Sequence, residues 1–330
     1  MKEYSIFKID QKPICIWDFN AEKNNSDFID SFDTEYFIYQ TELFEKELSG
    51  ENNYKAALSI RNIFHHSLET LFSLFCAVVQ SPYCVYGWLS LSRTYDLRNV
   101  VQKITDKDKS LFHYFDTDII SWQKIAETIY FLNNDFVLKE IDKYRLISDT
   151  TRIWEALADL FLNEYSIDGY NAMKHGLRAK TGGYTLNIGP AGTLNKPERH
   201  KEWITVGSSK YGSSFYILDK VSTSKMKKNP NYKSVRRYLN WNPEYLVDAI
   251  KLITCSISNM ISYLKIINGK DPSEIKYLVA DSDIIEKFWR YYNSRSNMSF
   301  GINTPDESIY CVTEEEIDNS LKRSSSSESS

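Results

Sequence analysis

The sequence predicts a mainly α-helical protein, a helical bundle with a small antiparallel β insertion. Three observations predict this class. The 330 residues include only 12 glycines and 8 prolines, about half of the usual ~12% share, so residues that interrupt helices are rare. Aromatic residues make up 14% of the chain, which favours a core of large side chains. Apolar residues recur along much of the chain at three- and four-residue steps, the period of an amphipathic helix.

The chain is expected to open with an N-terminal arm, residues 1–33, that holds two short β pieces. Residues 4–9 and 14–19 are short β-like segments, and a Lys-Pro dipeptide separates them. The polar and acidic residues at 21–33 are typical of a loop.

The helical bundle is predicted over residues 34–181. Its strongest helix spans 53–80, because apolar side chains recur there at helical spacing and form one continuous stripe. The stripe consists of Ile60, Phe64, Leu68, Leu71, Phe75 and Val78. Further helices are expected at 34–48, 95–105, 118–133, 135–146 and 151–180. Gly182-Gly183 closes the helical region.

The hydrophobic period changes after this glycine pair. Residues 184–188, 203–206 and 214–218 alternate between apolar and polar side chains or are rich in β-forming residues, and glycine and proline clusters separate them. These features predict a small antiparallel β insertion over 182–222.

Helical patterning returns in the C-terminal part. We expect C-terminal helices within 223–298, at 243–268 and at 282–293. The last segment, 299–330, ends in the low-complexity sequence RSSSSESS, which is typical of a disordered tail.

Several enzyme classes lack their sequence signatures here. The chain has no GxxxxGK(S/T) and no GxGxxG sequence, which disfavours P-loop nucleotidases and dinucleotide-dependent dehydrogenases. Its five cysteines form no CxxC pair, and its five histidines form no HExxH or HxxxH pair. We therefore expect neither a bound metal nor a cofactor.

The N-terminus and the longest apolar run indicate a cytoplasmic protein that does not enter a membrane. The first residues, MKEYSIFKIDQK, contain no apolar signal core. The longest strongly apolar run, LFSLFCAVVQ, is shorter than the ~20 residues that span a bilayer as a helix.

The net charge of −4 is the sum of two opposite regions. Residues 174–237 carry fourteen basic and three acidic side chains, a net charge of +11. Six of these cations are candidate ligand-binding residues: Lys225, Lys227, Lys228, Lys233, Arg236 and Arg237. Clustered cations suit a phosphate backbone, and the neighbouring Tyr232 and Tyr238 could stack on exposed bases. The alternatives are a solvated loop and a contact with an acidic partner or with the chain's own acidic part.

A first histidine set lies in the predicted helix 53–80. Arg61 and His65 are neighbours one turn apart, whereas His66 points toward the other flank of the apolar stripe. An arginine can hold a phosphate while a histidine, which titrates near neutral pH, moves protons. The alternative is that these residues only border the apolar face of an amphipathic helix.

A second set would form if the predicted helix 151–180 continues to its end. Asn171, Lys174, His175 and Arg178 would then share one face, which would concentrate anion-binding groups around a proton carrier. The alternative is a polar exposed face or a structural histidine.

The sequence Arg61-Asn62-x3-His66 resembles the Arg-x4–6-His motif, with a polar residue after the arginine, of HEPN-domain proteins. That family has an α-helical bundle, and many members are metal-independent ribonucleases of toxin–antitoxin, abortive-infection and CRISPR systems. The resemblance covers residues 34–180. It implies that Arg61 stabilises phosphate charge, that His66 acts as acid or base, that Asn62 orients them, and that the site forms across a dimer. The motif lies earlier in this chain than is usual in the family, and Lys174 would replace the arginine expected before His175.

These observations favour a cytoplasmic protein that binds RNA or another phosphate-rich ligand, and that cleaves RNA without metal in a bacterial defence or toxin–antitoxin system. The candidate catalytic residues are Arg61, His66, Lys174 and His175. The candidate binding residues outside the basic run are Asn62, His65, Asn171 and Arg178. Two alternatives remain: an interaction or scaffold protein whose basic segment docks an acidic partner, and a nucleotide-sensing module.

Overall fold

The computed structural model describes residues 4–18, 20–131, 143–190, 197–221, 231–293, 299–310 and 314–319. The chain divides into two compact units. The helical unit comprises Met1–Tyr170 and Asn242–Arg295, and the sheet unit comprises Asn171–Trp241 and Ser296–Ser330.

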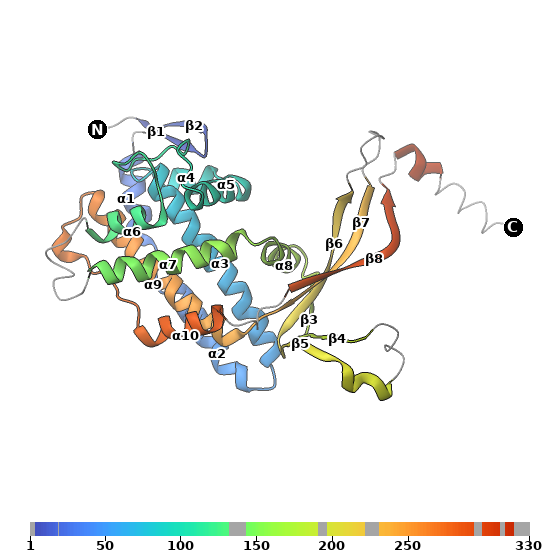
Figure 1. Cartoon of the computed structure of the whole chain (residues 1–330). Helices are drawn as coiled ribbons and strands as arrows, with labels where there is room; N and C mark the ends of the chain where they lie inside the picture. The colour runs from blue at the N-terminus through green and yellow to red at the C-terminus, as the bar shows by residue number, and fades with distance from the viewer. Residues whose placement is uncertain are drawn as a thin grey trace. The chain divides into compact units, whose positions relative to one another are not determined.

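The helical unit is organised around two long helices that lie side by side, α3 (Asn53–Gln80) and α9 (Pro243–Ile267) (Figure 1). Both are buried along most of their length. The other α-helices that begin in this unit are α1 (Ala21–Ser31), α2 (Tyr36–Glu45), α4 (Val85–Leu91), α5 (Thr94–Thr105), α6 (Trp122–Phe131), α7 (Lys143–Leu162), α8 (Glu164–Lys174) and α10 (Ser282–Tyr292). The expected mainly α fold with a small β part is confirmed.

The core of the helical unit is aromatic. The ring centroids of Phe75 and Trp154 are 4.5 Å apart, those of Phe72 and Phe161 are 4.9 Å apart, and Trp122 lies 5.5 Å from Phe72. Such offset or edge-on pairs add stability beyond the area they bury. Contacts between α3, α6 and α7 therefore include these large rings.

A buried amide side chain fixes the turn of an N-terminal β hairpin in the helical unit. The hairpin pairs β1 (Tyr4–Ile9) with β2 (Lys12–Trp17). Gln80, at the end of α3, accepts a hydrogen bond from the Asp10 amide at 2.9 Å and donates to the Asp10 carbonyl at 3.0 Å. Because Gln80 is fully buried, these bonds fix the hairpin turn against the helix end.

Helix α9 begins at a capped N-terminus and is buried along most of its length. The Asn242 side chain caps it by accepting from the amides of Glu244 and Tyr245, and Pro243 occupies the first turn. By length and composition, α9 is the one helix among the described residues that could cross a membrane, but 67% of its most apolar window is buried inside the protein. That burial is typical of the core helix of a globular unit.

The sheet unit contains a four-stranded antiparallel sheet in the order β3-β6-β7-β8. Its strands are β3 (Lys180–Thr181), β6 (Gly212–Val221), β7 (Asn231–Asn240) and β8 (Ser299–Tyr310). A separate antiparallel pair joins β4 (Thr185–Ile188) to β5 (Ile204–Ser208). Figure 1 shows β6, β7 and β8 as long neighbouring strands.

Three expectations about single elements need correction or lie outside the described residues. Residues 21–33 were expected to be a loop, but α1 occupies most of them, because Ala21, Asn25 and Ile29 give it a narrow buried face. The expected helix 151–180 is two helices, α7 and α8, and ends at Lys174. The expected helix 135–146 falls mostly outside the described residues.

The β region is also larger than expected. The segments 223–298 and 299–330 were expected to contribute C-terminal helices and a tail, yet each supplies one strand to the sheet, β7 and β8. Lysine and arginine side chains interrupt the apolar alternation of β7. The sequence pattern was therefore interpreted as a basic segment and not as a strand. The end of the expected tail, 320–330, lies outside the described residues.

Candidate functional sites

One face of the sheet unit gathers an arginine and two tyrosines. Tyr216 of β6 lies directly opposite Arg236 of β7, and Ser214 lies opposite Tyr238. Lys180 of β3 is the next residue across from Ser214. Side chains at directly paired positions point to the same side of a sheet, so these residues share one face.

The Arg236 guanidinium lies between two aromatic rings. Its central carbon is 5.4 Å from the ring centroid of Tyr216 and 5.2 Å from that of Tyr238. Nη2 also donates to the Ser214 hydroxyl at 3.2 Å. We call the three residues Tyr216, Arg236 and Tyr238 the Tyr–Arg–Tyr patch. The two cation–π contacts orient a planar cation on the sheet surface.

The Tyr–Arg–Tyr patch is open to solvent at one end and supported at the other. The Tyr216 side chain is 55% exposed, and the neighbouring Leu218 is 54% exposed. The Tyr184 ring stands edge-on against Tyr238, with centroids 4.6 Å apart and an angle of 81°. A rigid exposed ring next to a fixed guanidinium and the exposed Lys180 can stack a flat group and bind a phosphate.

Two other candidate cations, Lys233 and Arg237, lie on the opposite face of the sheet. Arg237 points to the opposite side of the sheet, where it is only 6% exposed and its Nη2 lies 3.9 Å from Asp219 Oδ1. Lys233 is exposed and pairs in register with Asp219. The candidate residues Lys225, Lys227 and Lys228 lie outside the described residues.

The second histidine set does not form the expected continuous helical face. Helix α8 ends at Lys174, and the backbone turns through Gly176 (φ 88°) and Leu177 (φ 49°). Lys174, His175 and Arg178 are exposed, and Arg178 Nε donates to the His175 carbonyl at 3.0 Å. Asn171 accepts the His175 amide through its backbone carbonyl. Arg178 therefore lies beyond the end of α8, and it does not share a helical face with Asn171 and Lys174.

The first histidine set contributes to a polar cluster inside the helical unit. Arg61 and His65 lie one turn apart on α3 and are only 6% and 7% exposed. The His65 ring stacks on Tyr170 of α8, with centroids 4.9 Å apart and an angle of 21°. The Tyr170 hydroxyl donates to Glu69 Oε2 at 3.4 Å. The Arg61–His65 cluster comprises Arg61, His65, Glu69, Arg98, Asp168 and Tyr170.

Burial and neighbouring cations determine the protonation of this cluster. Burial, and then the charges of Arg61 and Arg98, hold the pKa of His65 well below its usual range, so the ring is neutral at pH 7. Burial lowers the pKa of Arg61 to about 10, which leaves it charged. Burial also lowers the pKa of Arg98, an effect that Glu69 and Asp168 partly oppose. Burial and Glu69 raise the pKa of Tyr170 to about 12.

The structure places the two adjacent histidines on different sides of α3. His65 faces the cluster, and its Nε2 has no hydrogen-bond partner among the described residues. His66 is exposed, and its ring meets Phe37 of α2 edge-on at 5.1 Å. Asn62, one turn before His66, is half-buried. Of the two, His65 is the histidine that faces the cluster of Arg61.

The described residues contain no group of three or more His, Cys, Asp or Glu side chains that could hold a metal ion. The charged groups of the Tyr–Arg–Tyr patch are cations. In the Arg61–His65 cluster, the carboxylates of Glu69 and Asp168 already interact with Arg98. Both sites are therefore better suited to anionic or aromatic ligands than to a divalent cation.

Sequence reasoning missed several residues of these two sites. Tyr216 belongs to a recognised β segment, but its pairing with Arg236 depends on strand register. Arg98 and Asp168 reach the Arg61–His65 cluster only through helix packing. No local motif marks either of them.

Comparison with known proteins gives no match: no family model, no curated protein and no solved structure matches this chain.

Proposed function

We propose that this protein is a cytoplasmic RNA-binding protein that holds single-stranded RNA on the Tyr–Arg–Tyr patch. The observation that carries the proposal is the position of Arg236 between Tyr216 and Tyr238 on one sheet face. An exposed ring can stack on an unpaired base of any sequence, and a guanidinium beside it can bind the adjacent phosphate. The exposed Lys180 on the same face adds a second cation for the backbone.

Charge supports RNA over an acidic protein partner. Residues 174–237 carry a net charge of +11, whereas the whole chain carries −4. The positive charge is thus concentrated in the segment that supplies β3, β6 and β7. An acidic peptide would pair with lysine and arginine side chains, but it would not need aromatic rings beside the arginine. An arginine with aromatic rings on either side is better suited to a nucleotide, in which a base lies next to a phosphate.

The test is an anisotropy titration of the full chain with a fluorescein-labelled single-stranded RNA of mixed sequence. Tyr216→Ala should weaken binding about ten-fold or more, because stacking of one base on an aromatic ring contributes ~1–3 kcal/mol. Tyr95→Ala is the matched control, since Tyr95 is a 73% exposed tyrosine on α5 of the helical unit. Equal affinity of the two variants for the RNA would refute the proposal.

The Arg61–His65 cluster supports a second proposal, HEPN-like cleavage of RNA without metal as part of a defence or toxin–antitoxin system. The specific observation is a neutral imidazole close to two arginines. In such a reaction the 2′-oxygen bonds to phosphorus and the bond to the 5′-oxygen breaks. The 2′ proton passes to a base, a role that fits His65, and an acid protonates the leaving 5′-oxygen. Arg61 and Arg98 would stabilise the charge on the phosphate.

Cleavage is tested separately from binding. The full chain is incubated with mixed RNA in EDTA, and the products are examined for 2′,3′-cyclic phosphate ends. Under the second proposal, His65→Asn abolishes cleavage while Tyr216→Ala only weakens RNA binding. RNA binding without cleavage would leave the first proposal standing and refute the second. Binding of an acidic protein with no RNA affinity at low salt would favour an interaction protein.

A further inference from the structure

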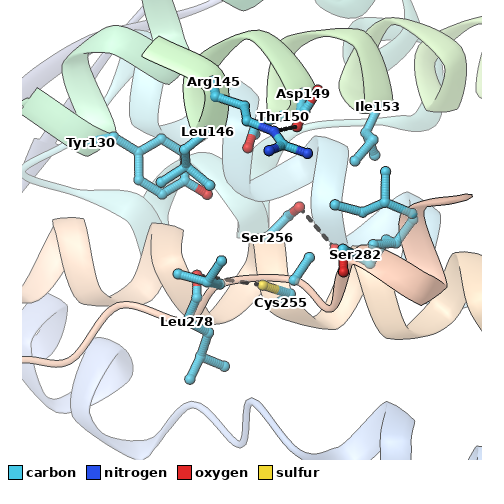
Figure 2. A pocket seen from close by; sticks show the side chains of 14 residues that line it. Tyr130, Arg145, Leu146, Asp149, Thr150, Ile153, Cys255, Ser256, Leu278 and Ser282 are labelled. Atoms are coloured by element: carbon cyan, nitrogen blue, oxygen red, sulfur yellow. Dashed lines mark hydrogen bonds and ion pairs between the residues drawn. The ribbon is translucent and has the colours of Figure 1, made fainter. Parts of the chain in front are cut away.

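The helical unit contains a cavity that neither proposal uses. It has a volume of about 500 Å³ and lies between α7, α9, the start of α10 and the segment 278–280 (Figure 2). This volume is within the range of sites for small organic ligands. Its apolar lining is supplied mainly by Leu146, Ile153, Leu252, Leu278, Val279 and Ile285.

The wall formed by 276–280 is fixed in place before any ligand binds. The buried Asn259 of α9 donates to the Leu278 carbonyl at 2.8 Å and accepts from the Leu278 amide at 2.7 Å. Ser262, one turn further along α9, donates to the Lys276 carbonyl at 2.9 Å. The cavity is therefore a preformed space, and a ligand would bear little cost of ordering it.

The polar atoms along α9 inside the cavity already have partners. The Ser256 hydroxyl donates to the Leu252 carbonyl and accepts from Trp154 Nε1, both at 2.9 Å. The Cys255 thiol donates to the Leu278 carbonyl at 3.7 Å, and burial raises its pKa to about 11, so it is neutral at pH 7. A ligand here meets no unused hydrogen-bonding group on α9.

The charged groups in the lining balance each other. Figure 2 shows Arg145 reaching toward Asp149 above the cavity, and Arg145 Nε lies 3.7 Å from Asp149 Oδ2. Arg145 and Asp149 are the charged residues in the lining. A charged ligand would have to compete with this pair or lose its own hydration without a counterion. Leu278 and Val279, 47% and 49% exposed, instead present apolar surface at the rim.

We propose that this cavity is a binding site for an uncharged, largely apolar small molecule. Such a ligand would remove the exposed surface of Leu278 and Val279 from water and fill the space above Ile153 and Leu252. Specificity would come from the shape of the fixed wall, because the polar groups that α9 contributes are already paired. Binding at this site does not depend on the Tyr–Arg–Tyr patch, since the cavity lies wholly within the helical unit.

The first experiment titrates the full chain with the neutral fluorophore N-phenyl-1-naphthylamine. The expected result is a saturable increase in fluorescence with one site per chain. Val279→Trp should block the rim and weaken binding about ten-fold or more. Val206→Trp is the control, because Val206 of β5 is similarly exposed, at 43%, in the sheet unit. No saturable binding, or equal binding by both variants, would overturn the proposal.

The second experiment leaves the cavity unaltered and so does not depend on the folding of Val279→Trp. In a Cys15→Ser, Cys311→Ser background, Cys255 is the half-exposed thiol, while Cys76 and Cys84 are buried. Saturating N-phenyl-1-naphthylamine should slow alkylation of Cys255 by N-ethylmaleimide several-fold. Alkylation at an unchanged rate would show that the fluorophore binds elsewhere. Stronger competition by an anionic naphthalene sulfonate than by a neutral naphthalene would contradict the uncharged ligand class.

Discussion

His65 and Tyr170 lie ring against ring, 4.9 Å apart, although they come from helices that are distant in the sequence. The Tyr170 hydroxyl in turn donates to Glu69, one turn after His65 on α3. The stack thus closes the Arg61–His65 cluster on one side and joins α8 to α3. It also keeps the imidazole out of water, which determines its charge.

The protonation of His65 predicts a pH dependence of stability. Its pKa is lowered in the folded state by burial and by Arg61 and Arg98, so the unfolded chain binds a proton more readily. Stability should therefore fall as the pH drops through ~6.5, the pKa of an unfolded histidine, by at most about 1.4 kcal/mol per pH unit for one proton. His65→Phe keeps an aromatic ring next to Tyr170 but removes the titrating group.

Urea unfolding between pH 7.5 and 5.5 measures the effect. The wild-type chain should lose more free energy of unfolding over this interval than His65→Phe does. Parallel pH curves for the two proteins would mean that folding does not shift the pKa of His65, contrary to its burial beside the charges of Arg61 and Arg98.

The adjacent arginines Arg236 and Arg237 should have separable effects, because they lie on opposite sides of β7. Arg236→Gln removes a cation from the Tyr–Arg–Tyr patch, so the RNA affinity should fall. The slope of log affinity against log salt concentration should also decrease, by the equivalent of about one phosphate contact. Arg237→Gln removes a buried partner of Asp219, so it should lower stability by about 1–2 kcal/mol. This prediction rests on the proposed RNA-binding function.

Anisotropy titrations at two salt concentrations and thermal unfolding compare these two variants directly. The expected pattern is a loss of affinity without loss of stability for Arg236→Gln. Arg237→Gln should show the reverse. A loss of RNA affinity for Arg237→Gln that matches its neighbour, in a fully folded sample, would contradict the assignment of binding to one face.

Gln80 should hold the N-terminal hairpin on the helical unit. Besides both backbone groups of Asp10, its side chain bonds the Phe112 carbonyl and the Trp88 indole. Gln80→Leu leaves these buried groups without partners, at a cost of about 1–3 kcal/mol or more. Hydrogen exchange should become faster in the hairpin, residues 4–17, before it does in α9. Unchanged protection of the hairpin would show that its other contacts, which include the Lys103–Asp10 ion pair and the Tyr114–Ile6 hydrogen bond, suffice.

The elements that the sequence predicted well are those whose pattern is long and local. Helix α3 was expected at 53–80 and is found there, because twenty-eight residues repeat one apolar stripe. Helix α1 was missed because its buried face includes Asn25, a polar residue whose side chain accepts the Val85 amide at 2.7 Å. Strand β7 was missed because arginines occupy both of its faces, which conceals the alternation.

The candidate sites depend on contacts that no local pattern contains. The pairing of Arg61 with His65 follows from helix geometry and was expected. Which of His65 and His66 meets this cluster depends on where α2 and α8 pack against α3. Arg236 was recognised as a cation, but its aromatic neighbours come from the β6–β7 register and from the sheet face they share. Tertiary arrangement decided both sites.

Asn259 should control both the stability of the helical unit and the proposed ligand cavity. Its fully buried side chain bonds both backbone groups of Leu278 and donates to the Tyr130 hydroxyl at 2.9 Å. Asn259→Leu should cost about 3 kcal/mol by urea unfolding, because three buried groups lose a partner, whereas Ser262→Ala should cost about 1. The cavity wall would then be free to move, so N-phenyl-1-naphthylamine should bind Asn259→Leu more weakly than Ser262→Ala. Equal costs in the two variants would mean that the apolar contacts of 276–280, rather than the buried amide, hold the wall in place.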